Sequence, residues 1–292
     1  MDMKGMAKEG LWAGLAGEVL AEIFSKLPFE DKMVTVPLVC KAWKDASRDP
    51  ICWRKVDMNK WYQKKVEENY WWQYEFECET EIEFYIRKVV DRSKGHLTEL
   101  HTMHCSDSVI EHIAETCPSL EVLSIPNSLL VTDKSAAKLA ANCCNLERLD
   151  ISDCYNISKQ ALEAFGQSCT SLVWLGRNML NQDQVSVDTS GPERGGDEEA
   201  IVMSKYMGKL KHLEMKRTSL SDLGLAHLTQ GCKQLETLDL ACCSLLSLRA
   251  LEDASKQCVN LTEFTKPMAQ QLTICAIANH FLFTTYGWGE RS

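Results

Sequence analysis

Apolar side chains near the start of the chain recur with the spacing of a single helix face. Between Val19 and Leu27 they fall at i, i+1, i+4, i+5 and i+8, which predicts an amphipathic helix. Pro28 ends this helix, because the residue before a proline is driven out of the helical region. The same spacing returns from Pro37, which favours a second helix there. About 40 residues would then carry three short helices, near the lower size limit for an independent core.

A different pattern begins after residue 96. Leu-x-x-Leu, usually followed by x-apolar, recurs six times, and Leu261-x-x-Phe264 makes a seventh unit. The first leucines are 23, 26, 26, 38, 25 and 26 residues apart. A period near 26 is typical of leucine-rich repeats, whose units would each be strand, turn and helix. The interval of 38 is one period plus a 12-residue insertion. The first leucines are Leu97, Leu120, Leu146, Leu172, Leu210, Leu235 and Leu261.

Cysteines follow the same period. A small apolar side chain with a weak donor suits the tight turn where each helix returns to the next strand, so we interpret these cysteines as packing residues. The chain has no Cys-x-x-Cys pair, and the cluster of His101, His104, Cys105 and His112 has the spacing of no standard metal site. We therefore predict no metal. In five repeats a cysteine stands three residues before the first leucine: Cys117, Cys143, Cys169, Cys232 and Cys258.

The N-terminal segment resembles an F-box. The resemblance rests on Leu15, Glu18-Val19-Leu20, Ile23-Phe24-Ser25-Lys26-Leu27-Pro28, Asp31, Val39-Cys40-Lys41-Ala42-Trp43-Lys44, Asp49-Pro50 and Trp53. It implies a three-helix module that docks on the adaptor Skp1 and so joins a cullin-based ubiquitin ligase. The family usually begins Leu-Pro, whereas Leu15 is followed by Ala16, and the loss of that rigid residue predicts weaker adaptor binding. The implied Skp1 contacts are Leu15, Val19, Leu20, Ile23, Phe24, Leu27, Pro28, Leu38, Val39, Trp43 and Trp53.

The order of segments resembles that of plant F-box/leucine-rich-repeat proteins. The fold class is then α/β: an N-terminal three-helix F-box followed by a short solenoid, a right-handed β-α horseshoe with parallel strands on its concave face. We expect the F-box over 11–57, a helical linker or cap over 58–96, and about seven repeats over 97–266 with an inserted loop at 181–199. The tail at 267–292 shows no leucine repeat and stays unassigned.

The linker is rich in Trp and Glu. Interleaved glutamates argue against bases stacking on its aromatic side chains, so we interpret Trp61, Trp71, Trp72 and Tyr74 as the joint between F-box and cap. The insertion is polar and Gly-rich. It is either a tolerated surface loop or a flap that contacts substrate or can be phosphorylated.

Residues beside the middle leucine of each strand should point to the concave surface, because side chains alternate along a strand. Trp174 stands out there, next to Arg148 and near Arg177, a composition typical of an interaction hot spot. A Trp folded over to cover a neighbour at the irregular fourth repeat is an equal alternative. The expected substrate contacts are Arg148, Asp150, Trp174, His212, Glu214 and Asp239.

The 292 residues have the composition of an ordinary soluble globular protein, with 45% hydrophobic and 25% charged side chains. A net charge of −9 and scattered basic residues argue against nucleic acid as a partner. Glu18 and Glu22 interrupt the apolar stretch from Leu11 to Phe24, so it is not a signal peptide, and the apolar run at 274–283 is too short for a membrane span. We expect no membrane contact, reduced thiols and a cytoplasmic and/or nuclear location.

No catalytic motif accompanies these patterns, so we predict a non-catalytic protein without cofactors. The resemblance implies the substrate receptor of a Skp1-cullin-F-box ligase. Its partners would be a Skp1-like adaptor, a cullin reached through that adaptor, and an unidentified protein substrate. Two alternatives stay open: a scaffold that acts outside a cullin ligase, and a small-molecule-dependent receptor, although seven repeats leave an open arc.

Overall fold

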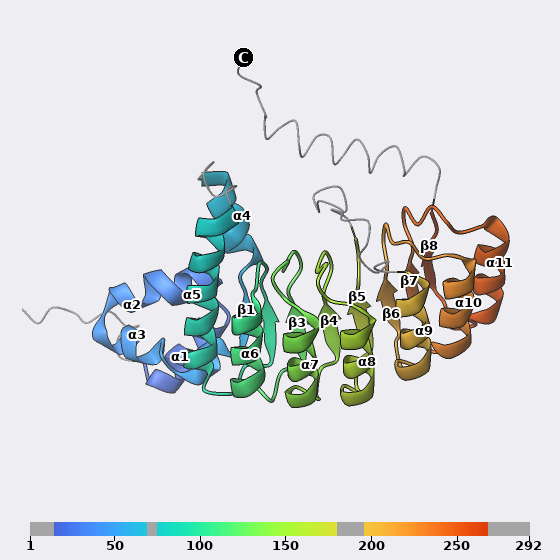
Figure 1. Cartoon of the computed structure of the whole chain (residues 1–292). Coiled ribbons are helices and arrows are strands. Elements are labelled where there is room, and N and C mark those ends of the chain that lie inside the picture. Colours follow the sequence, from blue (N-terminus) through green and yellow to red (C-terminus); the bar gives the residue numbers. More distant parts are fainter. Residues whose placement is uncertain (1–14, 69–74, 180–195, 268–292) are drawn as a thin grey trace, which may run out of the picture.

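The structure is a computed structural model that describes residues 15–68, 75–179 and 196–267. In Figure 1 the N-terminal helices pack at one end of a sheet, and a row of helices follows that sheet to its other end. Three sets of residues named above lie outside the described residues: 268–292 of the tail, 181–195 of the insertion, and Trp71, Trp72 and Tyr74 of the linker.

The N-terminal module is helical, as predicted, but its second helix is interrupted. Cys40 has an extended backbone (φ −162°, ψ 173°), so one continuous helix from Pro37 to Ala46 is wrong. The break lets Trp43 pack against Phe24, with ring centroids 5.0 Å apart. The elements are α1 (Gly17–Ser25), the π-helical η1 (Asp31–Thr35), α2 (Val36–Val39), α3 (Lys41–Ala46) and the 3-10 turn η2 (Pro50–Trp53).

The repeats form one parallel sheet whose strands follow one another in chain order, which confirms the predicted α/β solenoid. The middle residue of each strand points into the core, and the residues on either side of it point away from the helices. The strands are β1 (Lys55–Asp57), β2 (Glu99–His101), β3 (Val122–Ser124), β4 (Arg148–Asp150), β5 (Trp174–Gly176), β6 (His212–Glu214), β7 (Thr237–Asp239) and β8 (Glu263–Thr265).

Strand β1 precedes the first predicted repeat. It pairs with β2 in the same register that relates all later strands. Trp53, Val56 and Met58 fill the three apolar positions of a repeat, and none is more than 2% exposed. The sheet of the described residues therefore has eight strands, and its first one lies inside the segment that we assigned to the F-box.

Helices line one side of the sheet (Figure 1). Two of them, α4 and α5, follow β1 and make up the predicted helical linker, so this linker is the helical part of the first repeat unit. The helices are α4 (Asn59–Glu68), α5 (Glu75–Ser93), α6 (Asp107–Thr116), α7 (Asp133–Asn142), α8 (Lys159–Ser168), α9 (Asp197–Tyr206), α10 (Asp222–Gly231) and α11 (Leu248–Gln257).

The predicted insertion is too long at its C-terminal end. Asp197 is the first residue of α9, and Glu199 in the same turn is buried. The sequence alone places both in the inserted loop, because acidic residues next to glycines resemble a solvated segment. They belong instead to the helix of the repeat that begins at Trp174.

The cysteines pack at the helix ends, as interpreted from their period. Each of the five ends a helix as its C-cap residue. The Cys143 thiol donates to the carbonyl of Cys117 at 3.3 Å, and the Cys169 thiol donates to the carbonyl of Cys143 at 3.5 Å. Burial raises the pKa of Cys143 to about 12. These thiols therefore stay protonated and link successive repeats.

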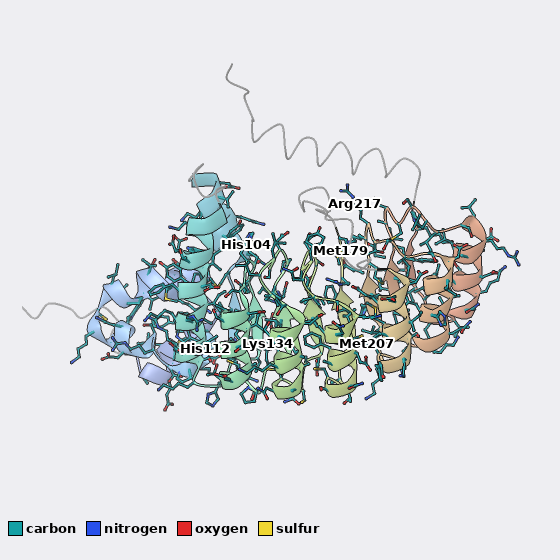
Figure 2. The ribbon with its side chains drawn as sticks, viewed as in Figure 1. His104, His112, Lys134, Met179, Met207 and Arg217 are labelled. Carbon is teal, nitrogen blue, oxygen red and sulfur yellow. The ribbon has the colours of Figure 1, made fainter. Side chains whose placement is uncertain are left out.

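A left-handed residue follows the strands at a fixed place. The third residue after β2, β3, β4, β6 and β7 has a positive φ between 52° and 62°. Two of these residues, His104 and Arg217, are labelled along the same edge of the molecule in Figure 2, beside Met179, which holds the corresponding place after β5. The turns at this edge therefore repeat as regularly as the strands do.

Candidate functional site

Exposed apolar side chains gather on the N-terminal module. Leu38 is 81% exposed and Val39 55%, and both lie on α2. Val19 and Ile23 of α1 are also exposed, as is Pro28. Aliphatic side chains left in water on so small a module indicate a surface that a protein partner covers. These five residues are the predicted adaptor contacts that the structure leaves accessible.

Three of the predicted adaptor contacts are wrong because they belong to the core. Leu20, Phe24 and Trp53 are at most 2% exposed. Leu15, Leu27 and Trp43 are partly buried and pack against the same core. The prediction also missed two exposed apolar residues of this module, Val34 and Ile51. Val34 stands four residues before Leu38, a helical spacing that could have identified it.

Trp53 joins the N-terminal module to the solenoid. Its indole Nε1 donates to the carbonyl of Ser47 at 2.8 Å, and the Arg92 guanidinium of α5 lies 4.8 Å from the ring centroid. Nearby, the buried Lys32 ammonium donates to the carbonyls of Cys52 and Lys55. Burial lowers the pKa of Lys32. Module and first strand therefore share one set of interior contacts.

An aromatic cluster strengthens the same joint. Trp61 of α4 lies 5.3 Å from Phe29 and 5.1 Å from Tyr85 of α5, measured between ring centroids. Phe29 and Tyr85 also touch, at 5.7 Å. The predicted role of Trp61 in joining the module to the linker is confirmed by these contacts. A rigid joint fixes the distance between the two surfaces that it separates.

The open face of the sheet carries two rows of side chains, one on each side of the buried middle column. Arg148, Trp174 and His212 are neighbours in one row, and Asp150, Gly176, Glu214 and Asp239 are neighbours in the other. We call this set the open-face strip. Of its members only Gly176 is buried, so the predicted substrate contacts on these strands do share one accessible surface.

Trp174 folds over its own strand, as one of its two predicted roles requires, and the hot-spot role stays a prediction. The Arg148 guanidinium lies 4.7 Å from the centroid of its ring. The ring also lies over Gly176, where a Cβ atom would come within 2.8 Å of the Trp174 Cη2 atom. Glycine thus makes room for the indole, which covers the strand and leaves part of its surface exposed.

The acidic residues of the strip have structural tasks. One carboxylate oxygen of Asp150 accepts from the backbone N–H of Ser152, and Asp239 does the same with Ala241, both at 3.0 Å. These bonds shape the turn that follows each strand. The negative charge of Asp239 is partly balanced by Lys216, whose Nζ lies 3.2 Å from a carboxylate oxygen of Asp239.

Lys216 also pairs with the predicted substrate contact Glu214, at 3.0 Å. Burial lowers the pKa of Lys216, but Glu214 and Asp239 outweigh that effect and hold it above its usual value. The ammonium group therefore stays charged between the two carboxylates. Asp239 and Glu214 thus face the open side of the sheet as members of an ion-pair network.

Arg177 is not part of the strip, and its predicted place beside Trp174 on the open face is wrong. Its side chain is 0% exposed and occupies the third apolar position of its repeat, where the next repeat has Met215. Glu199 of α9 is its partner in the core. In the sequence, the fourth repeat has Leu172 and Leu175 but no apolar residue at the third position. This gap could have indicated that Arg177 lies in the core.

The residues of the former metal candidate have separate partners. His101 contacts Glu99, His104 contacts the hydroxyl of Tyr62, and His112 contacts Asp91. Within 15–68, 75–179 and 196–267, no group of three or more His, Cys, Asp or Glu side chains could hold a metal ion. Over the same residues, no helix has both the length and the apolar character to cross a membrane.

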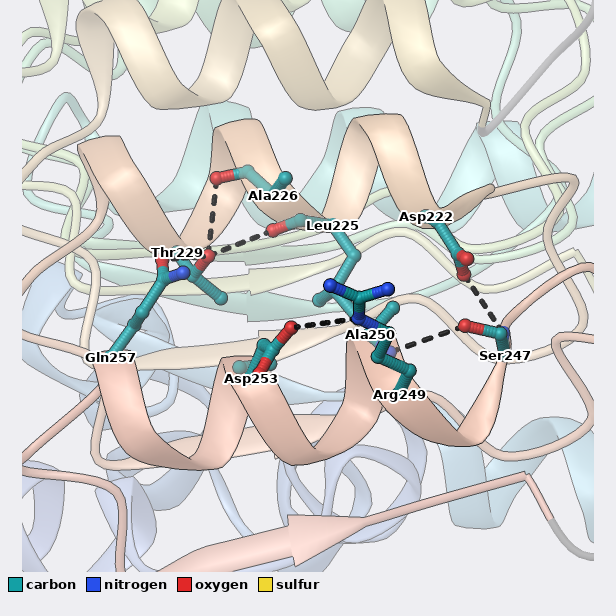
Figure 3. A pocket seen from close by; sticks show the side chains of 10 residues that line it. Asp222, Leu225, Ala226, Thr229, Ser247, Arg249, Ala250, Asp253 and Gln257 are labelled. Atoms are coloured by element: carbon teal, nitrogen blue, oxygen red, sulfur yellow. Dashed lines mark hydrogen bonds and ion pairs between the residues drawn. The ribbon is translucent and has the colours of Figure 1, made fainter.

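Two surface hollows lie away from the open-face strip. One, of about 690 Å³, lies between η2 and the turns that lead into the first repeats. The other, of about 330 Å³, separates α10 from α11. Figure 3 shows how α10 and α11 are tied at the ends of this second hollow, by Asp222 to Ser247 and by Thr229 to Gln257. Small side chains, among them Ala226 and Ala250, line its middle.

Several known proteins are similar to this chain. The F-box-like family matches residues 17–59. The chain is 37% identical to F-box protein SKIP1 of Arabidopsis thaliana, over 88% of this chain and 87% of that protein. It is 38% identical to F-box/LRR-repeat protein 19 of the same plant, over 88% and 87%. A crystal structure of the yeast Rad7 and Elc1 complex matches with 15% identity and a TM-score of 0.42, over 73% of this chain and 53% of that one.

Proposed function

Because the chain belongs to the F-box/leucine-rich-repeat proteins known from plants, we propose that it is the substrate-recognition subunit of a Skp1-cullin-F-box ubiquitin ligase. Its N-terminal module would bind a Skp1-type adaptor, which brings in the cullin. Its repeats would hold a protein target for ubiquitination and degradation, in the cytoplasm or the nucleus. The chain itself would perform no catalytic step.

One observation carries this proposal. The module leaves Val19, Ile23, Leu38 and Val39 exposed, while Leu20, Phe24 and Trp53 are buried in its core. Burying each such side chain against a partner is worth about 1.5–3 kcal/mol. A contact surface of this kind on α1 and α2 supports docking onto an adaptor.

The contribution to ubiquitination would be positional. A receptor that holds its target beside a ubiquitin-charged partner turns a bimolecular reaction into an effectively intramolecular one. Such a gain requires a fixed geometry between the two ends of the receptor. Trp53 and the Phe29, Trp61 and Tyr85 cluster supply it, because they tie the module to the first repeat.

Adaptor binding tests the proposal directly. The full chain is co-expressed with a Skp1-type adaptor, and affinity is measured for the wild type, Ile23→Asp and Leu38→Asp. Each substitution should weaken binding by about tenfold or more, since it places a charge in an apolar contact. Leu223→Asp is the matched control, because Leu223 is 58% exposed and lies on α10.

The outcomes separate the proposal from its rival. Equal affinities for all three variants would show that the α1 and α2 surface is not the docking site. In a parallel co-expression that also supplies the cullin, capture of the adaptor without the cullin would favour a scaffold that acts outside the ligase. Capture of both, lost together in Ile23→Asp, is the result that the proposal requires.

A further inference from the structure

The far end of the sheet is uncovered in the described structure. β8 pairs with β7 on one side and is the last strand in the order. Its middle residue, Phe264, is only partly buried, whereas Leu238 in the same column is 0% exposed. Leu261 is likewise half-buried, although its counterpart Leu235 is fully buried. Val259 beside them is 85% exposed.

The opposite end of the solenoid is sealed. Val56, the middle residue of β1, is only 2% exposed, and it lies in one buried core with Phe24 of α1 and Ile86 of α5. A repeat array exposes a core edge wherever its last unit lacks a neighbour, and natural arrays cover that edge. The end formed by α11 and β8, which we call the C-terminal edge, therefore lacks an occupant among the described residues.

The sequence beyond β8 keeps the phase of the repeats. A Ser or Thr immediately precedes the helix of a repeat at Thr132, Ser158, Ser221 and Ser247. Thr132 and Ser158 are 26 residues apart, as are Ser221 and Ser247. Another 26 residues from Ser247 is Thr273.

The residue types at two buried helix positions also recur in the sequence after Thr273. The third and fourth residues after the cap are a small and then an aliphatic residue, buried in α8 as Ala161 and Leu162. α10 repeats this order with Gly224 and Leu225. After Thr273 the same places hold Ala276 and Ile277. The seventh and eighth places depart from the pattern, since His280 stands where α8 has Phe165 and Phe281 stands where α8 has Gly166.

We infer that the segment around Thr273–Phe281 is the occupant of the C-terminal edge, packed on α11 and β8 in the place of one further repeat. Ala276 and Ile277 would cover Phe264 and Leu261. Only seven residues separate Thr265 from Thr273, so the segment acts at the high effective concentration of a short tether. A second copy of the chain has no such advantage. This inference is independent of the proposed ligase role.

A matched pair of substitutions in the full chain tests the register. Ile277→Asp changes a residue that the register places against the edge. Leu282→Asp makes the same kind of change at the ninth place after the cap, which is exposed in α7, α8 and α10. Amide hydrogen exchange is followed at β8 and, as an internal reference, at β4. A third variant deletes residues 268–292.

We expect Ile277→Asp and the deletion to speed exchange in β8 by about tenfold or more while β4 changes little. Leu282→Asp should leave β8 near the wild type. The inference is overturned if the deletion leaves β8 unchanged, or if the two Asp variants behave alike. It is also overturned if protection of β8 in the wild type rises with protein concentration, because a second copy would then be the occupant.

Discussion

Arg177 and Glu199 form a bidentate ion pair inside the repeat core, with both N–O distances at 2.9 Å. The other three N–H groups of Arg177 donate to the backbone carbonyls of Ile151, Cys154 and Ile157. All five donors of the guanidinium are therefore satisfied. Arg177 precedes and Glu199 follows residues 180–195, so the pair fixes the repeat on both sides of the insertion.

Removing one partner of this pair should cost more than removing both. Glu199→Leu leaves the guanidinium buried without its counter-charge, which should lower the free energy of unfolding by about 3–5 kcal/mol. In the double variant Arg177→Met, Glu199→Leu, apolar side chains refill the core, so more than half of the loss should be recovered. Urea denaturation measures both. A double variant less stable than Glu199→Leu alone would contradict this account.

Gly176 should be intolerant of a side chain for as long as Trp174 is present. A Cβ atom at Gly176 would force the indole off the strand, so Gly176→Ala should lower the free energy of unfolding by about 1–3 kcal/mol. In a Trp174→Ala background the same change should cost clearly less. A thermal-unfolding cycle over the four proteins gives this coupling, and a cost independent of Trp174 would show that Asp150, the other neighbour, sets it.

The repeats could be predicted from the sequence because one residue type, leucine, recurs at their equivalent core positions. The leucine period located seven of the strands, and the cysteine period located the helix ends that precede them. β1 escaped because Trp53, Val56 and Met58 fill the leucine positions with other apolar residues. The leucine period thus identifies a repeat only where leucines fill its core positions.

The candidate surfaces were harder to predict for a physical reason. Val19 and Leu20 are adjacent on one apolar stripe of α1, and the sequence does not say which of them faces the core. Only the packing of α3 and η2 decides it. Arg177 and Glu199 are 22 residues apart, across an insertion, so no local spacing links them. Contacts between segments that are distant in the sequence therefore decide both which residues of α1 are exposed and where Arg177 lies.

Asp107 should make the stability of the repeats sensitive to acid. Partial burial raises the pKa of Asp107, but hydrogen bonds from Ser135 and from the hydroxyl and backbone N–H of Thr132 outweigh it and hold it below its usual value. A depressed pKa in the folded state contributes stability above the unfolded pKa of about 3.9, and this is lost as the pH falls through the folded value.

Asp107→Asn isolates that contribution. The variant should be less stable than the wild type at pH 7, by about 1–2 kcal/mol, since a neutral amide accepts these bonds less well. The difference should shrink below about pH 4, where the wild-type carboxyl takes up its proton. Urea denaturation at a series of pH values measures it. A difference that stays constant from pH 7 to pH 3 would assign the loss to packing.

Ala16→Pro should tighten adaptor binding. Ala16 has φ −60° and ψ 142°, which a proline ring adopts without strain, and its carbonyl already accepts from Leu20 at the start of α1. Fixing this φ removes unfolded conformations and should stabilise the module by about 0.4–1 kcal/mol. Adaptor affinity should rise severalfold if α1 is ordered only part of the time in the free protein. Exchange rates of the α1 amides and adaptor affinity are measured together.

Ala16→Val is the control for this change, because it adds side-chain bulk without closing a ring. Slower exchange in α1 for the proline variant, with the valine variant at the wild-type rate, assigns the effect to φ. An Ala16→Pro variant that stabilises α1 without changing adaptor affinity would show that the ordering of α1 does not limit docking. In that case the exposed Val19 and Ile23 would set the affinity through their contacts alone.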